Sequence, residues 1–142
     1  MTSHPGEQPV TMLEEIDRAE CVTLLAATRY GRLAVVDAGR PHLVVLNHVV
    51  VDGHLLFRVE EDSTLARLTQ GYAVHAAYEV DSAFPVGRSG WSVIVEGLLE
   101  RESDPDLVGA ARREIVAWAG GERETVLRLR VDNLSGRRAG PL

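Results

Sequence analysis

The sequence contains a single cysteine, and no apolar run in it approaches the roughly 18 residues that a membrane-spanning helix needs. Cys21 therefore cannot form a disulfide within the chain, and its neighbours indicate a buried helical position rather than an activated thiolate. The stretch from Met1 to Val10 is polar and lacks the apolar core of a signal peptide. We therefore expect a cytoplasmic protein with no membrane partner.

Basic residues are fewer than acidic residues: the sequence has 15 lysine and arginine residues and 21 acidic residues, so the formal net charge is −6. Such a surface would repel nucleic acid and anionic lipid unless a local basic patch overcame the total. Neither of them is expected as a partner.

Several familiar catalytic and metal-binding patterns are missing as well. The segment Gly87–Gly90 is not a nucleophile elbow, because its second glycine directly follows Ser89. The chain has no P-loop, no dinucleotide-binding glycine pattern and no His-Glu-x-x-His motif. His42 and His48 share one face of a predicted strand but would stand about 20 Å apart, too far to share an ion. The sequence predicts no metal site and assigns no catalytic residue.

The composition is that of a globular protein, with 45% hydrophobic and 25% charged residues. Its length suits one domain over 1–142, with a loose N-terminal arm over 1–12 and a C-terminal tail over 133–142. The predicted strands are Leu33–Val36, His42–Val51, His54–Arg58, Tyr72–Val80, Trp91–Arg101 and Thr125–Val131, and the predicted helices follow Asp17, span Ser63–Gln70 and run from Asp104 to near Trp118. Because this order lacks regular βαβ alternation, it favours a mainly β fold, a six-stranded antiparallel barrel of Greek-key type with short helices at its ends.

Asp52-Gly53 is the sharpest local signal, because this dipeptide favours a two-residue β-hairpin turn in which both residues adopt positive φ. The turn also fixes the register of the strands around it. On one face the register pairs Val51 with His54, Val49 with Leu56 and Asn47 with Arg58, and on the other it pairs His48 with Phe57. We interpret His48 as a strand residue stacked on Phe57.

Asn47 and Arg58 would form a polar pair on a face that is otherwise apolar, and such groups usually have a partner. Arg58 also precedes a helix whose first turn offers Ser63 and Thr64, with hydroxyl and backbone N–H donors suited to an anion such as phosphate. Alternatively, Arg58 pairs with a carboxylate of the Glu60–Glu61 segment at the barrel rim. The residues by themselves leave both interpretations open.

A series of short motifs runs through nearly the whole chain, from about Asp17 to Arg138. They are Gly31–Ala34, Gly39–Pro41, Asp52-Gly53, Phe57-Arg58, Ser63–Leu68, Ser89–Val93, Gly97 and Ser135–Arg138. In these motifs the sequence resembles the pyridoxamine 5′-phosphate oxidase-like family, and the segment GWSVIVEG is the most specific piece. The resemblance implies an FMN-binding split barrel that forms a homodimer, with a flavin in each of two clefts between the subunits.

The same resemblance assigns a set of residues to the cofactor. Arg58, Val59, Ser63, Thr64 and Leu65 would hold the flavin phosphate, Leu46, Asn47 and His48 would lie along the isoalloxazine ring, and Arg88 and Trp91 would come from the partner subunit. Trp91 can also be interpreted as a strand residue that covers the barrel end. The chain departs from the family at Thr64, where relatives commonly have lysine, and at Val59, where they often have threonine.

These features predict an FMN-dependent oxidoreductase acting on a small-molecule redox substrate, in which the protein binds and orients the flavin and excludes water. The missing lysine and the acidic segment Glu60–Asp62 leave two alternatives. In one, the cleft holds a deazaflavin or haem in place of FMN. In the other, the chain is a dimeric binding protein that has lost both FMN and the chemistry.

Overall fold

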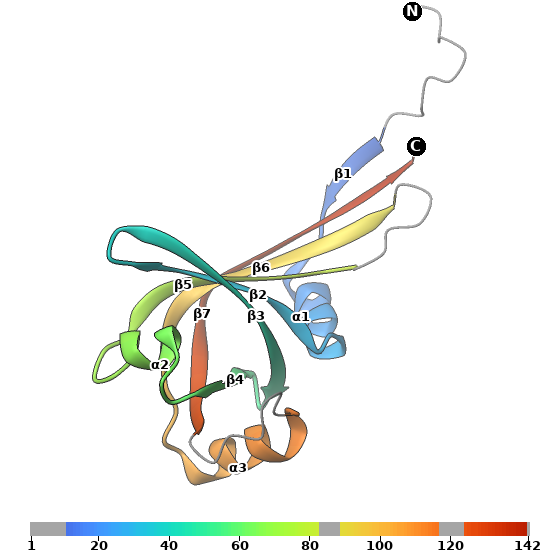
Figure 1. Ribbon diagram of the computed structural model, residues 1–142. Coiled ribbons are helices and arrows are strands. Elements are labelled where there is room, and N and C mark those ends of the chain that lie inside the picture. The colour runs from blue at the N-terminus through green and yellow to red at the C-terminus, as the bar shows by residue number, and fades with distance from the viewer. Residues whose placement is uncertain (1–10, 83–88, 117–123, 142) are drawn as a thin grey trace, which may run out of the picture.

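The computed structural model describes residues 11–82, 89–116 and 124–141, and most of them lie in strands (Figure 1). In chain order the elements are β1 (Thr11–Glu15), α1 (Arg18–Ala27), β2 (Tyr30–Asp37), β3 (Arg40–Val51), β4 (His54–Glu60), α2 (Thr64–Leu68), β5 (Val74–Asp81), β6 (Gly90–Arg101), α3 (Pro105–Glu114) and β7 (Glu124–Pro141). None of the helices in these ranges is long and apolar enough to cross a membrane.

Six of the described strands form a closed antiparallel ring in the order β7, β4, β3, β2, β5 and β6, and the pairing of β6 with β7 closes it. β1 lies outside the ring and pairs with the C-terminal part of β7. In Figure 1, α3 lies at the end of the barrel where β4 and β7 meet, and α1 and α2 lie on opposite sides. The predicted mainly β barrel with short helices is confirmed.

The β3–β4 hairpin adopts the predicted turn, with φ values of 50° at Asp52 and 78° at Gly53. The register pairs His48 with Phe57, Val49 with Leu56, Val50 with Leu55 and Val51 with His54. This ladder stops one residue before the predicted pair of Asn47 with Arg58, so that part of the prediction is wrong. At this point β3 continues along β2, where Asn47 lies opposite Tyr30, whereas β4 continues along β7. The two strands of the hairpin therefore separate where the predicted site begins.

The helices begin at side-chain caps that the sequence marks. Asp17 accepts a hydrogen bond from the backbone N–H of Glu20 at 2.8 Å and so caps α1, the helix predicted to follow Asp17. Ser63 and Asp104 cap α2 and α3 in the same way. α2 is a single turn of five residues, shorter than predicted. The predicted end of the third helix near Trp118 falls outside the described residues.

Two apolar clusters lie on the two faces of β4. Leu55, Phe57 and Val59 belong to the main barrel core, whereas Leu56 packs in a second cluster with residues of α3 and β7. Residues two apart on a strand point to the same face, so Arg58 shares the side of Leu56. This placement puts Arg58 beside α3 and outside the barrel core.

The last strand is much longer than predicted. The sequence analysis ended it at Val131 and treated 133–142 as a tail, but β7 continues to Pro141 and pairs there with β6 and β1. β1 likewise begins at Thr11, inside the predicted arm. A register shift between Glu96 and Gly97 interrupts the β6–β7 ladder, and a Cβ built on Gly97 would lie 1.6 Å from the Arg130 carbonyl oxygen. This bulge lets two long strands stay paired while they bend.

Candidate functional site

A pocket of about 360 Å³ lies where β3 and β4 separate, and α2 and the C-terminal end of α3 complete its wall. This volume is at the lower end of the roughly 300–1,000 Å³ typical of ligand sites. The residues that line it are His42, Val44, Val45, Leu46, Asn47, Arg58, Val59, Glu60, Ser63, Thr64, Leu65, Ile115, Val116 and Glu124. The β3 side of the wall is mostly apolar, and the β4 and α2 side carries the polar and charged groups.

Seven of the ten predicted cofactor residues meet in this one pocket: Leu46, Asn47, Arg58, Val59, Ser63, Thr64 and Leu65. Their convergence depends on the hairpin, because the turn brings two distant parts of the chain to the same barrel rim. Ile115, Val116 and Glu124 also line the pocket, although the sequence analysis did not predict them.

Arg58 donates hydrogen bonds to one carboxylate and to two backbone carbonyl groups. Its Nε donates to Glu124 Oε2 at 2.7 Å and its Nη2 donates to the same oxygen, while its Nη1 donates to the carbonyl oxygens of Arg112, at 3.1 Å, and Ile115. A guanidinium has five N–H groups, so these four contacts use all but one. The two side chains of the ion pair are 15% and 10% exposed, respectively.

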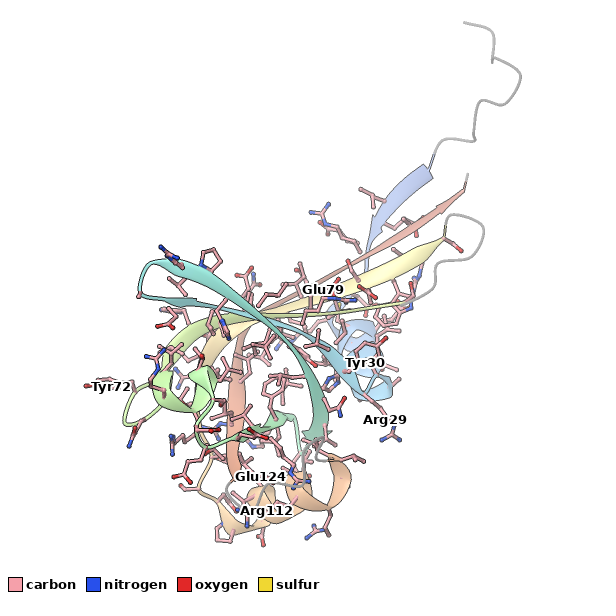
Figure 2. The ribbon with its side chains drawn as sticks, viewed as in Figure 1. Arg29, Tyr30, Tyr72, Glu79, Arg112 and Glu124 are labelled. Carbon is pink, nitrogen blue, oxygen red and sulfur yellow. The ribbon has the colours of Figure 1, made fainter. Side chains whose placement is uncertain are left out.

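Strand register explains the Arg58–Glu124 pair. β4 and β7 pair so that Arg58 lies opposite Val126, and Glu124, two residues earlier, is the diagonal neighbour on the same face. The last carbonyl groups of α3 point at the same guanidinium, and a cation at that end of a helix is stabilising. Arg58 does pair with a carboxylate, but its partner is not in the Glu60–Glu61 segment that the sequence suggested. Figure 2 shows Glu124 and Arg112 close to α3.

The hydroxyl groups at the start of α2 also have structural roles. Ser63 Oγ accepts a hydrogen bond from the backbone N–H of Ala66 at 3.2 Å and so caps the helix. Leu65 is 2% exposed and belongs mainly to the core, whereas Thr64 is half-buried. The sequence contains no lysine, so Thr64 has no lysine neighbour to replace the one that relatives carry.

The side chain of His48 lies in the barrel core, where the residue is 4% exposed, and not in the pocket. Nδ1 is 2.6 Å from the Tyr78 hydroxyl, and Nε2 is 3.0 Å from the carbonyl oxygen of Leu25. His48 is paired with Phe57 in the ladder, as predicted, and the ring of Tyr78 meets both of these rings edge to face. Burial lowers the pKa of His48, which favours the neutral imidazole.

Trp91 lines a different cavity, of about 430 Å³, which shares no lining residue with the first. There Arg32 forms ion pairs with Glu79 at 3.3 Å and Asp81 at 3.2 Å. Burial, followed by the neighbouring carboxyl group of Asp81, raises the pKa of Glu79. Figure 2 shows Glu79 on the sheet, well away from Glu124. A single chain therefore does not bring Trp91 to the pocket, and Arg88 lies outside the described residues.

The closed ring of antiparallel strands, with a ligand-sized pocket where two of them separate, defines a split-barrel protein. The chain belongs to the pyridoxamine 5′-phosphate oxidase family, whose model matches residues 17–138. It is 35% identical over 125 residues to the uncharacterized protein Rv0080 of Mycobacterium tuberculosis. The aligned region covers 86% of this chain and 82% of that protein.

Solved structures give the same fold. The FAD-binding protein of Mycobacterium smegmatis is 26% identical with a TM-score of 0.73, over 88% of this chain and 98% of that one. An FAD-binding protein of Mesorhizobium loti is 24% identical with a TM-score of 0.75, over 91% of this chain and 99% of that one. An FAD- and haem-binding protein of Mycobacterium smegmatis is 16% identical with a TM-score of 0.66, over 89% and 82%. The structural neighbours thus include proteins named for binding FAD and haem.

Proposed function

We propose that this protein binds a flavin nucleotide in the pocket between β3 and β4 and uses it for redox chemistry on a small molecule. The observation that carries the proposal is the convergence of seven predicted cofactor residues in one pocket of a chain that belongs to this family. The FAD-binding protein of Mycobacterium smegmatis, at 26% identity, supports the flavin class of ligand.

The two ends of the pocket suit different parts of a flavin. Val44, Val45 and Leu46 of β3 give an apolar wall that can cover a flat ring and exclude water from one side of it. Asn47 adds an amide, a group that can both donate and accept hydrogen bonds at the ring edge. The bound flavin would supply the electron transfer, and the protein would orient it.

The charged end of the pocket fits a flavin phosphate less well. Arg58 already donates four of its N–H groups to Glu124 and to the end of α3. Ser63 caps α2 with its hydroxyl oxygen, which leaves its O–H proton as the remaining donor. The ring-binding part therefore supports a flavin in general, and the phosphate-binding part decides which flavin ester is accepted.

The proposed active form is a homodimer. Val36, Leu43 and Val45 lie on the outer face of β2 and β3 and are 66%, 67% and 65% exposed, an unusual grouping for a free surface. Val45 also lines the pocket, so a second copy on this face would cover the open side of the pocket. In such a dimer Trp91 would come from the partner, as the family resemblance implies, and in its own chain it lines another cavity.

The test is the absorption spectrum of the purified protein, followed by titration of the ligand-free form with FMN and FAD. A flavin spectrum with saturable binding of either ester supports the proposal. A haem or deazaflavin spectrum would support the alternative cofactors, and a colourless protein that binds neither ester would support a binding protein without redox chemistry. Turnover with a reductant and an electron acceptor then tests whether the protein is an oxidoreductase.

Sedimentation velocity tests the dimer separately. Leu43→Glu should convert a dimer into a monomer, because it places a charge in the middle of the proposed interface. Tyr72→Glu is the control, since Tyr72 is 73% exposed and lies outside β2 and β3, with its side chain directed outward in Figure 2. A wild-type monomer would refute the shared site.

A further inference from the structure

We propose that Glu124 selects the phosphate ester that the pocket accepts and favours the pyrophosphate diester of FAD over the phosphate monoester of FMN. This inference rests on the proposed flavin function and names a specificity-determining residue for it. The sequence analysis assigned FMN by family resemblance, and the contact between Glu124 and Arg58 is what changes the expectation.

Glu124 occupies the position on Arg58 that a phosphate would need. Its Oε2 accepts from both Nε and Nη2, the two donors that form the side of the guanidinium best suited to a bidentate anion. Both side chains are mostly buried, at 15% exposure for Arg58 and 10% for Glu124. Screening by solvent is therefore weak, and an incoming anion must either displace the carboxylate or remain close to it.

The other charged groups of the pocket wall also disfavour a doubly charged phosphate. Among the residues that the structure describes, one arginine, Arg58, and two carboxylates, Glu60 and Glu124, line it. Two further arginines near α2 are already engaged, because Arg67 pairs with Asp37 at 2.7 Å and Arg101 donates to the Ala66 carbonyl at 2.7 Å. Arg112 and Arg113, in the last turn of α3, are exposed, so solvent and salt screen their charges.

The two flavin esters differ in the charge that they bring to this wall. A phosphate monoester carries a charge of about −1.5 to −2 near neutral pH, whereas each phosphate of a pyrophosphate diester carries a single negative charge. Coulomb repulsion by Glu124 acts most strongly on the nearest phosphate, so at that phosphate it is about 1.5 to 2 times as strong for FMN as for FAD. FAD also has an adenosine group whose contacts do not require a free Arg58.

Glu124→Gln tests this directly, because glutamine keeps the size of the side chain and an oxygen acceptor for Arg58 but removes the negative charge. Dissociation constants are measured for riboflavin, FMN and FAD by quenching of flavin fluorescence. For the wild type we expect FAD to bind at least about tenfold more tightly than FMN, and FMN to gain little over riboflavin. In Glu124→Gln, the affinity for FMN should rise about tenfold and that for FAD only about three- to fivefold, because the smaller charge on the nearest phosphate of FAD gives a proportionally smaller change in free energy.

Glu61→Gln is the matched control. Glu61 is exposed and does not line the pocket, so the same substitution there should leave the FMN to FAD ratio unchanged. Circular dichroism is used to check that both variants are folded. If Glu124→Gln does not fold, the wild-type order of affinities still decides, because FMN binding as tightly as FAD overturns the proposal.

The outcomes separate this inference from the proposed function. Flavin binding with an FMN preference, or with a ratio that Glu124→Gln does not change, overturns the role of Glu124 and leaves the flavin function standing. Failure of all three flavins to bind either protein overturns both. A gain in FMN affinity that is confined to Glu124→Gln supports the assignment.

Discussion

The buried contact between Tyr78 and His48 allows a sharp stability prediction for Tyr78→Phe. The Tyr78 hydroxyl lies 2.6 Å from His48 Nδ1 and 3.1 Å from the Leu46 carbonyl oxygen. The Leu25 carbonyl oxygen can only accept, so His48 Nε2 carries the proton of the neutral ring, and Nδ1 is the nearer of the two acceptors that share the one Tyr78 proton with the Leu46 carbonyl oxygen. Removing the hydroxyl leaves Nδ1 without its donor in the barrel core.

The expected loss follows from that unpaired acceptor. A buried polar group that loses its partner costs about 1–3 kcal/mol in free energy of unfolding. The Phe57 contact, at 4.8 Å between ring centroids, survives because phenylalanine retains the ring. For the 142 residues of this chain the unfolding entropy is about 0.3 kcal/mol/K, so each kcal/mol lowers Tm by about 3 °C. Tyr78→Phe should therefore melt about 3–10 °C below the wild type.

Urea unfolding and thermal melting, both followed by circular dichroism, measure this loss. Tyr72→Phe is the matched control, because Tyr72 is 73% exposed and its side chain points outward in Figure 2. The control should change the free energy of unfolding by less than about 0.5 kcal/mol. If Tyr78→Phe were as stable as this control, the hydroxyl would not be a required partner of His48, and the reasoning would be refuted.

Three further predictions concern the same core and the β6–β7 ladder. Burial lowers the pKa of His48, so below pH 6.5, the ordinary pKa of histidine, the unfolded state binds more protons than the folded state. The free energy of unfolding should therefore decrease as the pH is lowered, by up to about 1.4 kcal/mol per pH unit. Urea unfolding of His48→Gln should show a weaker dependence on pH in this range. Gly97→Ala should unfold at least about 2 kcal/mol more easily, because its Cβ would collide with the Arg130 carbonyl, while Gly140→Ala, with open space around it, should not. Cys21 is fully buried and burial raises its pKa, so thiol reagents should label it only after unfolding, as mass spectrometry can show.

Local signals in the sequence predicted local structure well. The Asp52-Gly53 turn fixed the register of β3 and β4, and the capping residue Asp17 placed the start of α1, because each depends on neighbours within a few positions. The mainly β class and the antiparallel barrel followed from the number of predicted strands and the absence of βαβ alternation, whereas the order of the strands in the ring came from the structure. The end of β7 was missed, because most residues from Asp132 to Arg138 are polar and their strand conformation comes from pairing with β6.

The candidate site could be predicted only in part, for two physical reasons. Adjacent residues on a strand point to opposite faces, so Asn47 and His48 have different surroundings although they are neighbours in the sequence. In the structure Asn47 lines the pocket, whereas His48 is buried in the barrel core. Glu124, in contrast, meets Arg58 across 66 positions of the chain, and only the β4–β7 register makes that contact visible.

Arg58 lines the pocket and also holds Glu124 and the end of α3 together. These two roles determine which substitution can give information about flavin binding. Removing its guanidinium would leave Glu124 as an unpaired, mostly buried carboxylate and would free the carbonyl groups at the end of α3, so the fold itself would lose stability. A weaker flavin affinity in Arg58→Ala would then mix a lost ligand contact with a disturbed wall. Glu124→Gln avoids this ambiguity, because it keeps every donor of Arg58 in place and changes only the charge that an incoming phosphate would meet.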